Sequence, residues 1–273
     1  MIYGSFFNPT QARDLLNSEI EKDRHKVNPE TLEGKAILTF GRKIYESLIK
    51  GYTQKQWQTD PNSLPAATIN RIPLRFNLDC NYFEDTYQGL PLSGYNSLIS
   101  NMLDDKNITL ELNVDFFKVR DKVVSPLVVY TGPVDKYFDY QFQPLLWRTL
   151  DFVFEIHKSK DFQGCAVIND PSPANQFTRI HEFKHLHPER SYNTDFTLIA
   201  KEFSRFAEFS DEPYYPVNSF HDKDRLSKYR KLVSLEEKKG TFFGGRLASY
   251  KYLDMHMAIA SAHTLFNSLR NYS

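Results

Sequence analysis

Apolar and polar positions follow a helical period over most of the first fifty residues. An amphipathic run follows Pro9, and Asn28, Pro29 and Glu30 form a sequence typical of a helix start. The next apolar positions with helical spacing are Ile37, Phe40, Ile44 and Leu48. The pattern predicts helices over this region, and the second is expected to end at Gly51, because glycine commonly terminates helices.

The periodicity weakens over residues 52–91, which are rich in Tyr, Trp, Pro and Arg. This composition predicts an ordered loop with short helical turns, and such loops often carry binding residues. A helical pattern returns at 94–103, and apolar alternation predicts strands at 108–117 and 126–133. A Gly-Pro pair is expected to end the second of these strands.

Strand-like runs recur at short spacing in the second half of the chain. They are TLDFVFEI, GCAVIN, TRIHEFKH and TLIAKEF. These runs predict an antiparallel sheet with one face wetted. Further on, TFFGGRL predicts a strand that opens into a glycine turn, and residues 254–271 form an apolar-striped helical pattern. Strand, glycine turn and helix are together typical of half of a nucleotide-binding α/β domain.

The predicted fold class is therefore α+β, with a residual Rossmann-like α/β part. The short connections leave no clear linker, so the domains are expected to be discontinuous in sequence. The expected domains are a helical domain at 1–50, an antiparallel-sheet domain at 51–88 and 140–218, and the nucleotide-binding α/β domain at 89–139 and 219–273.

Charge and composition argue against several classes of protein. Lys plus Arg and Asp plus Glu both number 34, so no net field favours nucleic acid or an anionic membrane. No apolar stretch approaches the ~20 residues needed to span a bilayer, and the start of the sequence lacks a signal-peptide pattern. Cys80 and Cys165 lie far apart and outside any metal-binding spacing. We expect a cytoplasmic protein whose anion sites depend on a few placed arginines.

The loop-rich region offers aromatic side chains that could bind a nucleotide. Tyr52 and Trp57 follow the predicted end of a helix. One interpretation is that their rings only cover the core. The other is a platform on which a base or a sugar stacks.

Two arginines in the same region could bind phosphate. Arg71 and Arg75 lie on either side of a proline that stiffens the backbone between them. Each guanidinium could fork onto phosphate oxygens. The alternative is that both pair with surface carboxylates such as Asp79 or Glu84.

The run TRIHEFKH carries further basic residues. Alternation along a strand places Arg179 and His181 on one face. The spacing of His181, His185 and His187 is also compatible with a metal site. Zinc, however, prefers a closed ligand set or two histidines four apart on a helix, and this run is predicted to be a strand. We therefore expect no metal.

The glycine pair Gly244 and Gly245 could let a ligand approach the backbone closely. The helix that follows would offer unpaired N–H groups at its start. An ordinary helix start capped by Asp254 is the alternative, and the two interpretations are compatible. The double tyrosine at 214–215 is either part of a rigid turn or a pair of phenols that donate to phosphate.

Seven motifs, taken in order, resemble those of bacterial UDP-galactopyranose mutases. They are GYTQKQW, RIPLRF, NYFEDTYQGLP, YTGPVDKYFDY, TRIHEFKH, EPYYPVN and GGRLASYKYLDM. The series covers nearly all of this chain but only about the last three-quarters of a usual family member. The resemblance implies interconversion of the pyranose and furanose rings of UDP-galactose. It also implies FAD as cofactor, whose reduced flavin attacks the anomeric carbon through N5.

The resemblance also implies roles for individual residues. Arg71 and Arg179 would clamp the diphosphate and stabilise the leaving charge. Tyr52 would stack on the uracil, and Trp57 would lie on a mobile loop that closes over the substrate. The hydroxyls expected at the phosphates are those of Tyr82, Tyr215 and Tyr252. The residues expected along the flavin are Gly245, Arg246, Tyr252, Leu253, Asp254 and Met255, and Asp254 is also expected at the substrate.

The sequence departs from the family pattern in two ways. It has no GxGxxG turn to hold the FAD pyrophosphate. Gln143, Leu146 and Trp147 stand where the family tends to have Gly, Glu and Tyr, which is expected to reshape the wall beside the sugar. We expect an incomplete gene product or a misassigned start, with apolar surface exposed near 108–130 and 241–270.

Two alternatives to an active mutase stay open at this point. The chain could be a non-catalytic remnant that binds sugar nucleotides without flavin chemistry, or a subunit completed by a separately encoded N-terminal half. The expected partners are UDP-galactose and UDP-galactofuranose, and no nucleic acid or membrane. Because the family is commonly dimeric, a homodimer is also expected.

Overall fold

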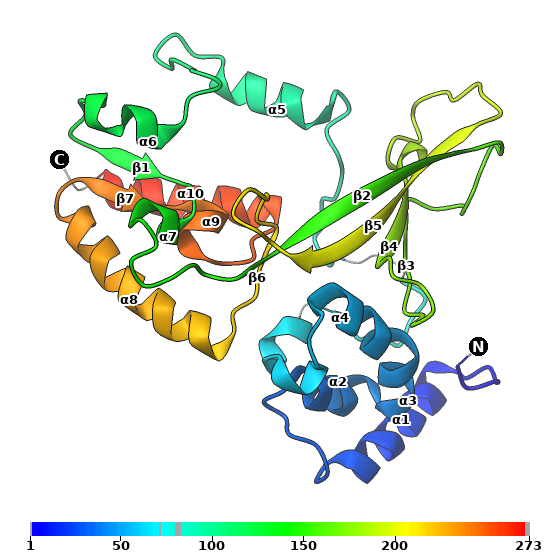
Figure 1. Cartoon of the computed structure of the whole chain (residues 1–273). Helices are drawn as coiled ribbons and strands as arrows, with labels where there is room; N and C mark the ends of the chain where they lie inside the picture. Colours follow the sequence, from blue (N-terminus) through cyan, green and yellow to red (C-terminus); the bar gives the residue numbers. More distant parts are fainter. Residues whose placement is uncertain (1, 71, 80–82, 271–273) are drawn as a thin grey trace. The chain divides into compact units, whose positions relative to one another are not determined.

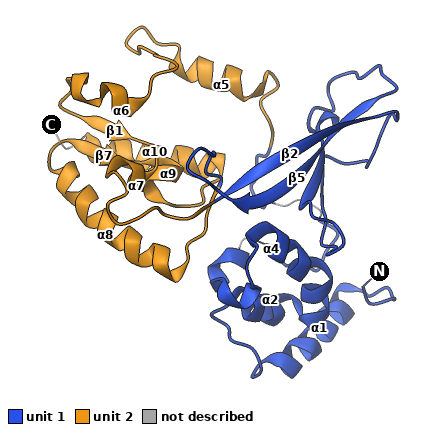
Figure 2. Cartoon of the chain, in the orientation of Figure 1, with its two compact units in different colours: residues 1–88, 148–214 blue, residues 89–147, 215–273 orange. Residues whose placement is uncertain are grey.

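The computed structural model describes residues 2–70, 72–79 and 83–270. The chain forms two compact units that interleave in sequence, as Figure 2 shows. Unit 1 comprises residues 1–88 and 148–214, and unit 2 comprises residues 89–147 and 215–273. The predicted α+β class is confirmed, because helices and an antiparallel sheet occur together. The further division of unit 1 into a helical and a sheet domain stays a prediction.

The first part of unit 1 is helical (Figure 1). Its helices are α1 Pro9–Asp23, α2 Leu32–Phe40, α3 Arg42–Ile44, a π-helical turn Tyr45–Ile49 and α4 Lys50–Trp57. Short 3-10 turns follow at Pro61–Ser63 and Ala66–Ile69. Local chemistry fixes the helix starts: Asn8 accepts a hydrogen bond from the Gln11 N–H at 2.9 Å, and the Thr31 hydroxyl accepts one from Gly34 at 3.1 Å.

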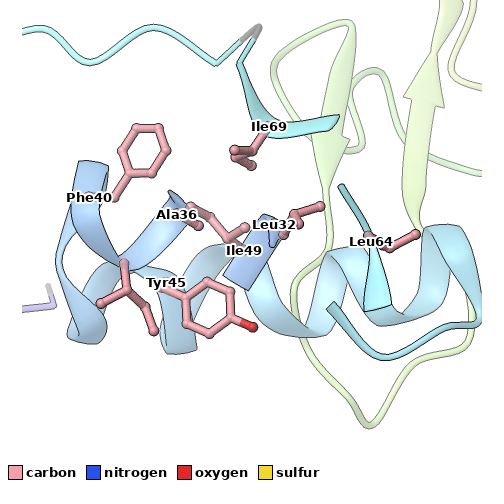
Figure 3. Packing of buried hydrophobic residues seen from close by; sticks show 8 residues of the cluster. Leu32, Ala36, Phe40, Tyr45, Ile49, Leu64 and Ile69 are labelled. Atoms are coloured by element: carbon pink, nitrogen blue, oxygen red, sulfur yellow. The ribbon is translucent and has the colours of Figure 1, made fainter. Parts of the chain in front are cut away.

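One apolar cluster holds these helices together (Figure 3). Its buried members are Leu32, Ala36, Ile37, Phe40, Tyr45, Ile49, Leu64 and Ile69. The Tyr45 hydroxyl donates to Glu33 Oε2 at 2.7 Å, so this ring is buried without leaving its polar end unpaired. Arg42 and Asp23 join α3 to the end of α1, with Nη2 and Oδ1 2.9 Å apart.

Gly51 does not end a helix, so that prediction is wrong. It lies inside α4, which continues to Trp57 and ends at Gln58 in the left-handed region with a φ of 47°. A Cβ atom added to Gly51 would lie 2.1 Å from the carbonyl oxygen of Pro171. Glycine is required here because the backbone of a distant loop crosses α4 at close range.

Four strands of unit 1 form the predicted antiparallel sheet. They are β2 Trp147–His157, β3 Val167–Asn169, β4 Arg179–Glu182 and β5 Thr197–Phe206. Trp147, the first residue of β2, belongs to unit 2. The short strand β6 Tyr215–Pro216 completes the order β3-β4-β5-β2-β6.

The register of this sheet shows which side chains share each of its two faces. Arg179 and Phe152 both lie opposite Glu202 and therefore share its face. The other face carries ion pairs that suit a wetted surface, such as Lys201 Nζ and Glu155 Oε1 at 2.7 Å. The prediction of an antiparallel sheet is confirmed, but a single wetted face is not, because apolar side chains on the Glu202 face, such as Phe154 at 60%, are also exposed.

Unit 2 contains the predicted strand–glycine turn–helix unit. Its helices are α5 Gly94–Leu103, α6 Phe116–Val119, α7 Val134–Tyr137, α8 Phe220–Glu237, α9 Gly245–Ser249 and α10 Met255–Leu269. Strands β1 Val128–Tyr130 and β7 Thr241–Phe243 pair in parallel. Aromatic rings around Tyr130 and Tyr137, whose centroids are 5.0 Å apart, form the core beside this pair.

The predicted strand at 108–117 is wrong. Residues 108–113 form no regular element, and Phe116 begins α6. The apolar alternation is present, but the side chains that would form its buried face are exposed, with Leu112 at 72%. Within the described part of unit 2 this segment pairs with no strand, so its alternation does not become part of a sheet. No helix in the described residues is long and apolar enough to cross a bilayer.

The close approach at Gly51 makes a direct prediction about stability. We expect Gly51→Ala to lower the free energy of unfolding by about 1–3 kcal/mol, because the new methyl group forces α4 away from Pro171. Denaturant unfolding would measure this loss. Gly89→Ala is the matched control, because no atom lies within 4 Å of the added Cβ. Equal or greater stability of Gly51→Ala, as expected for a simple helix-propensity gain, would contradict the packing argument.

Candidate functional site

Arg179 is the predicted site cation that the structure describes in unit 1. It begins β4, and its Nη2 donates to the Tyr52 hydroxyl at 2.7 Å. Its Nε lies 3.1 Å from Glu202 Oε1. The guanidinium is thus held between a helix residue and a strand residue, which fixes its plane. The structure therefore brings together two residues that the sequence placed in the same site, Tyr52 and Arg179.

Glu202 completes this cluster, although it was not among the site residues predicted from the sequence. Its side chain is only 2% exposed and also accepts from the Thr178 hydroxyl at 3.1 Å. Its second oxygen lies 3.0 Å from His181 Nε2. A carboxylate so deeply buried requires partners of opposite charge, and Arg179 supplies one. The available signal was a lone acidic residue in the apolar strand TLIAKEF.

Trp57 does not lie on a loop, so that part of its expected role is wrong. It is the last residue of α4, and its ring packs partly against the helical core cluster. The chain leaves helical geometry only at Gln58. Helical packing therefore accounts for the ring position, and a part in substrate binding stays a prediction.

The arginine pair of the RIPLRF motif divides between two outcomes. Arg71 lies outside the described residues, as does Tyr82. Arg75 pairs with surface carboxylates, which was the alternative to phosphate binding. Its Nε lies 3.8 Å from Asp79 Oδ2 and 3.6 Å from Glu84 Oε1.

The histidines of TRIHEFKH are used separately. His181 faces Glu202, while His185 Nε2 lies 3.3 Å from Asp161 Oδ2 and 3.5 Å from Glu182 Oε2. Oxygen and nitrogen atoms of Asp161, Glu182 and His185 approach within 4.8 Å of one another, a spacing that a metal ion could bridge. Lys184 already places its ammonium 3.0 Å from Glu182 Oε1. A fixed positive charge at the carboxylates opposes a second cation there.

Glu182 is fully buried and accepts an unusual number of hydrogen bonds. Burial by itself raises its pKa, but donors outweigh that effect and lower the pKa to about 2. The Thr197 hydroxyl donates at 2.6 Å and the Gln163 N–H at 2.8 Å, and Lys184 and the Phe162 N–H also contribute. Glu182 thereby fixes the loop before β3 to the edge of the sheet.

In unit 2 the carboxyl ends of the parallel strands form the second group of predicted site residues. The Gly244 N–H donates to the Tyr130 carbonyl oxygen at 3.1 Å, which brings the ends of β7 and β1 together. Gly245 follows with a φ of 78°, a conformation that favours glycine. A Cβ there would meet Thr131 Cβ only at 3.7 Å, so the turn leaves room above it. Ligands of open α/β sheets bind at this end of the strands. Thr131, at the end of β1, was not among the predicted site residues.

Three flat groups stack beside this turn. The Tyr215 and Tyr252 rings are stacked with centroids 5.4 Å apart and an interplanar angle of 19°. The Arg246 guanidinium carbon lies 4.6 Å from the Tyr252 ring centroid and 5.4 Å from that of Tyr215. Arg246 Nη1 also donates to the Leu253 carbonyl oxygen at 3.4 Å. The structure thus places Arg246, Tyr252 and Leu253, which were expected along the flavin, beside Tyr215, which was expected at the phosphates. Those roles stay predictions.

Asp254 and Met255 mark the start of α10. Asp254 occupies the N-cap position, as the alternative interpretation expected, but its side chain makes no capping hydrogen bond. Met255 is the first helical residue and is half exposed. The carboxylate of Asp254 is therefore not committed to the helix end.

The three positions that depart from the family pattern have distinct local effects. Gln143 has a φ of 72°, in the region that favours the glycine typical of the family. Leu146 is 40% exposed, and its carbonyl oxygen accepts from the Tyr250 hydroxyl at 2.6 Å. Trp147 packs edge-on against Tyr250 at 5.0 Å, and its buried indole Nε1 has no partner in the described residues.

A hollow of about 590 Å³ also opens in unit 2. Its lining residues are Arg120, Tyr137, Phe138, Asp139, Gln141 and Glu236. The Tyr137 hydroxyl donates to Glu236 at 3.3 Å, which ties two sides of the hollow together. None of the predicted site residues lines it, so its size is no argument for placing the substrate there.

Comparison with known proteins identifies the family. The family model for UDP-galactopyranose mutase matches residues 47–252, which include the Tyr52–Arg179–Glu202 cluster and the Arg246 stack. The chain therefore belongs to the UDP-galactopyranose mutase family, and the expected family is confirmed.

Two curated relatives show the range of activity within this similarity. The chain is 39% identical over 255 residues to a probable UDP-galactopyranose mutase of Klebsiella pneumoniae, covering 93% of this chain and 64% of that protein. It is 36% identical over 265 residues to the dTDP-fucopyranose mutase of Escherichia coli, covering 95% of this chain and 69% of that protein. The chain thus spans slightly less than two thirds of the length of the Klebsiella relative.

A solved structure supports the same fold. The crystal structure of a reduced UDP-galactopyranose mutase matches with a TM-score of 0.63 over 89% of this chain and 69% of the other, at 13% identity. At that identity the match concerns the fold alone.

Glu182 provides a prediction about pH. Because its pKa is depressed below the ordinary value of 4.5, its stabilising contribution is complete above that value and is lost as the pH falls through about 2. We expect Glu182→Gln to cost about 1–3 kcal/mol of stability at neutral pH. The difference from the unaltered chain should shrink below pH 4.5, because a protonated Glu182 resembles glutamine.

Thermal unfolding at a series of pH values would measure this difference. Glu111→Gln, at an exposed position of the other unit, serves as the control and should leave the pH dependence unchanged. A stability difference for Glu182→Gln that stays constant between pH 7 and pH 3 would show that the charge of Glu182 is not what stabilises the fold.

Proposed function

We propose that this chain binds UDP-galactose and UDP-galactofuranose as part of a flavin-dependent mutase that interconverts them. The observation that carries the proposal is the guanidinium of Arg179, fixed between Tyr52 and Glu202 in a chain that belongs to the mutase family. A pre-ordered arginine beside an aromatic ring suits the diphosphate and base of a sugar nucleotide.

Arg179 can serve this purpose without giving up its partners. A guanidinium presents five N–H donors, so it can hold Glu202 and Tyr52 and still bind phosphate oxygens. Its charge would stabilise the diphosphate most strongly as the bond to the sugar breaks, because negative charge then develops on the leaving oxygen. Arg71 is proposed as the second clamp on its motif position alone.

The residues of unit 2 fit the flat end of FAD in part. The open turn at Gly245, the ends of β1 and β7, and the Arg246–Tyr252 stack suit a planar ring that approaches the backbone closely. Gly245, Arg246, Tyr252, Leu253, Asp254 and Met255 would hold it. Reduced FAD, when bound, would supply the nucleophile for the anomeric carbon. The sequence offers no GxGxxG turn for the cofactor pyrophosphate.

The choice of sugar nucleotide has one competitor. The Escherichia coli relative is named a dTDP-fucopyranose mutase and is nearly as similar as the Klebsiella protein. A diphosphate clamp does not distinguish the two substrates, because both carry the same diphosphate. UDP-galactose is the proposed substrate, and dTDP-fucopyranose is the comparison substrate for the test.

The first experiment is an absorbance spectrum of the purified chain with and without added FAD. Dithionite reduction and addition of UDP-galactofuranose follow, with the sugar products separated by chromatography. Bound flavin and conversion to the pyranose would support the proposal. Conversion of dTDP-fucopyranose alone would correct the substrate. UDP binding with no flavin and no turnover would instead favour a non-catalytic binding protein.

A substitution tests the clamp separately from the flavin. We expect Arg179→Ala to weaken UDP binding by about 1.5–3 kcal/mol, the usual loss for a charge-assisted contact. Isothermal titration calorimetry with UDP would measure it. Arg205→Ala is the matched control, because Arg205 lies on the opposite face of β5 and pairs with Asp151 at 2.8 Å. Unchanged UDP affinity in Arg179→Ala, with a normal control, would remove Arg179 from the site.

A further inference from the structure

The proposed function gives no part to His181, although this side chain lies close to the Arg179 cluster. His181 follows Arg179 by two residues on β4, and alternation along the strand places both side chains on the same face. Glu202 on β5 lies opposite Arg179. Ala200 lies opposite His181 and carries only a methyl group, so the imidazole can reach diagonally to the carboxylate of Glu202. The register of the two strands therefore brings His181 and Arg179 to one carboxylate.

The two oxygens of Glu202 have different neighbours. Oε1 accepts from the Thr178 hydroxyl at 3.1 Å and lies 3.1 Å from Arg179 Nε. Oε2 lies 3.0 Å from His181 Nε2. A carboxylate offers only acceptors, so His181 Nε2 carries the hydrogen and donates it to Oε2. Arg179 thus approaches one oxygen, and His181 occupies the other.

Two aromatic rings hold the imidazole of His181 in this position. The Phe183 ring is stacked with it, with centroids 6.0 Å apart and an interplanar angle of 10°. The Phe152 ring lies 6.0 Å away at an angle of 60°. Packing therefore orients the donor toward Glu202. Because the side chain of Glu202 is only 2% exposed, Oε2 depends on a protein donor for its hydrogen bond.

Loss of the donor at Oε2 would change how Arg179 pairs with Glu202. A buried oxygen without a hydrogen bond bears the full cost of its desolvation. Arg179 already contacts this carboxylate, and a guanidinium pairs most strongly when it binds both oxygens of a carboxylate at once. Such a side-on fork uses Nε and Nη2, but Nη2 donates to the Tyr52 hydroxyl at 2.7 Å. The fork would therefore withdraw Nη2 from Tyr52 and rotate the guanidinium.

We propose that His181 is a positioning residue for the sugar-nucleotide site. By occupying Oε2, it limits Arg179 to one oxygen of Glu202 and leaves Nη2 with Tyr52. The guanidinium then keeps the orientation that suits a diphosphate beside the Tyr52 ring, whose centroid lies 5.9 Å from the guanidinium carbon. His181 acts through Glu202 and Arg179 and not by contact with the ligand. This inference rests on the proposed function, because it concerns how Arg179 is held for UDP.

Two substitutions separate the hydrogen bond of His181 from its packing. His181→Phe keeps a ring between Phe152 and Phe183 but removes the donor, whereas His181→Gln removes the ring but keeps an N–H that can reach Oε2. We expect His181→Phe to weaken UDP binding by about fivefold or more in isothermal titration calorimetry, and His181→Gln to restore most of the affinity. A role in packing alone would give the opposite order. His181→Leu, which also lacks a donor, replaces His181→Phe if that variant does not fold.

A measurement without ligand tests the positioning itself. The crystal structure of the His181→Phe variant should show Arg179 Nε and Nη2 each within about 3.2 Å of a Glu202 oxygen, with Nη2 withdrawn from the Tyr52 hydroxyl. In the His181→Gln variant the Nη2 contact with Tyr52 should persist. An unaltered guanidinium in the His181→Phe variant would overturn the proposal, whatever the affinity for UDP.

His157→Phe is the matched control for the loss of a histidine that pairs with a glutamate. His157 Nε2 lies 3.1 Å from Glu155 Oε2, but both residues lie on the face of the sheet opposite Glu202. This variant should leave the affinity for UDP and the position of Arg179 unchanged. Weakening as large as that in His181→Phe would show a general disturbance of the sheet and would overturn the proposal.

Comparison with Arg179→Ala separates this inference from the proposed function. Weaker UDP binding in Arg179→Ala together with unchanged binding in His181→Phe would overturn the role of His181 and leave the proposed clamp intact. Unchanged UDP binding in Arg179→Ala would overturn the clamp and, with it, the role of His181. Weaker binding in both variants, with recovery in His181→Gln, is the expected result.

Discussion

A buried guanidinium joins the helices of unit 1 to its sheet. Arg148 on β2 is fully buried, and its Nε donates to the Gln56 carbonyl oxygen at 3.1 Å. Its Nη atoms reach Gln58 Oε1 at 3.1 Å and Ser204 Oγ at 3.2 Å, all neutral acceptors. Burial lowers the pKa of Arg148 to about 10, so the side chain stays charged at neutral pH. A buried charge is strongly destabilising without its hydrogen bonds, and this requirement fixes the end of α4 against β2 and β5.

The same constraint determines where Arg179 lies. Since α4 is held at its end by Arg148, Tyr52 in its first turn has little freedom relative to the sheet. Lys55 strengthens this arrangement by donating to the carbonyl oxygens of Phe177 at 2.8 Å and Ser172 at 3.0 Å, in the loop that leads into β4. The Tyr52–Arg179–Glu202 cluster is therefore placed by backbone contacts on both sides. Its preorganisation belongs to the fold of unit 1 and does not require a ligand.

Elements with a clear apolar period between turn residues could be predicted from the sequence. The helix at 94–103 and the antiparallel strands are encoded by period and turn residues. The wrong predictions concern patterns whose structural role depends on residues distant in sequence. Glycine at position 51 allows a close approach by Pro171, and the alternation at 108–114 pairs with no strand of the described residues. The same distinction applies to the candidate site. Sequence motifs indicated Arg179, whereas the part played by Glu202 follows from the register of β4 and β5.

The interleaving of the two units has a consequence for how the chain can be divided. The backbone passes between them at residues 88–89, 147–148 and 214–215. A protease that cleaves any one of these crossings leaves the units joined by the other two, so a single cut releases neither. The two segments of each unit are separated in sequence by a segment of the other unit. The entropy cost of closing such a loop grows only slowly with its length. Closure entropy therefore adds little to the cost of folding either unit around the segment inserted in it.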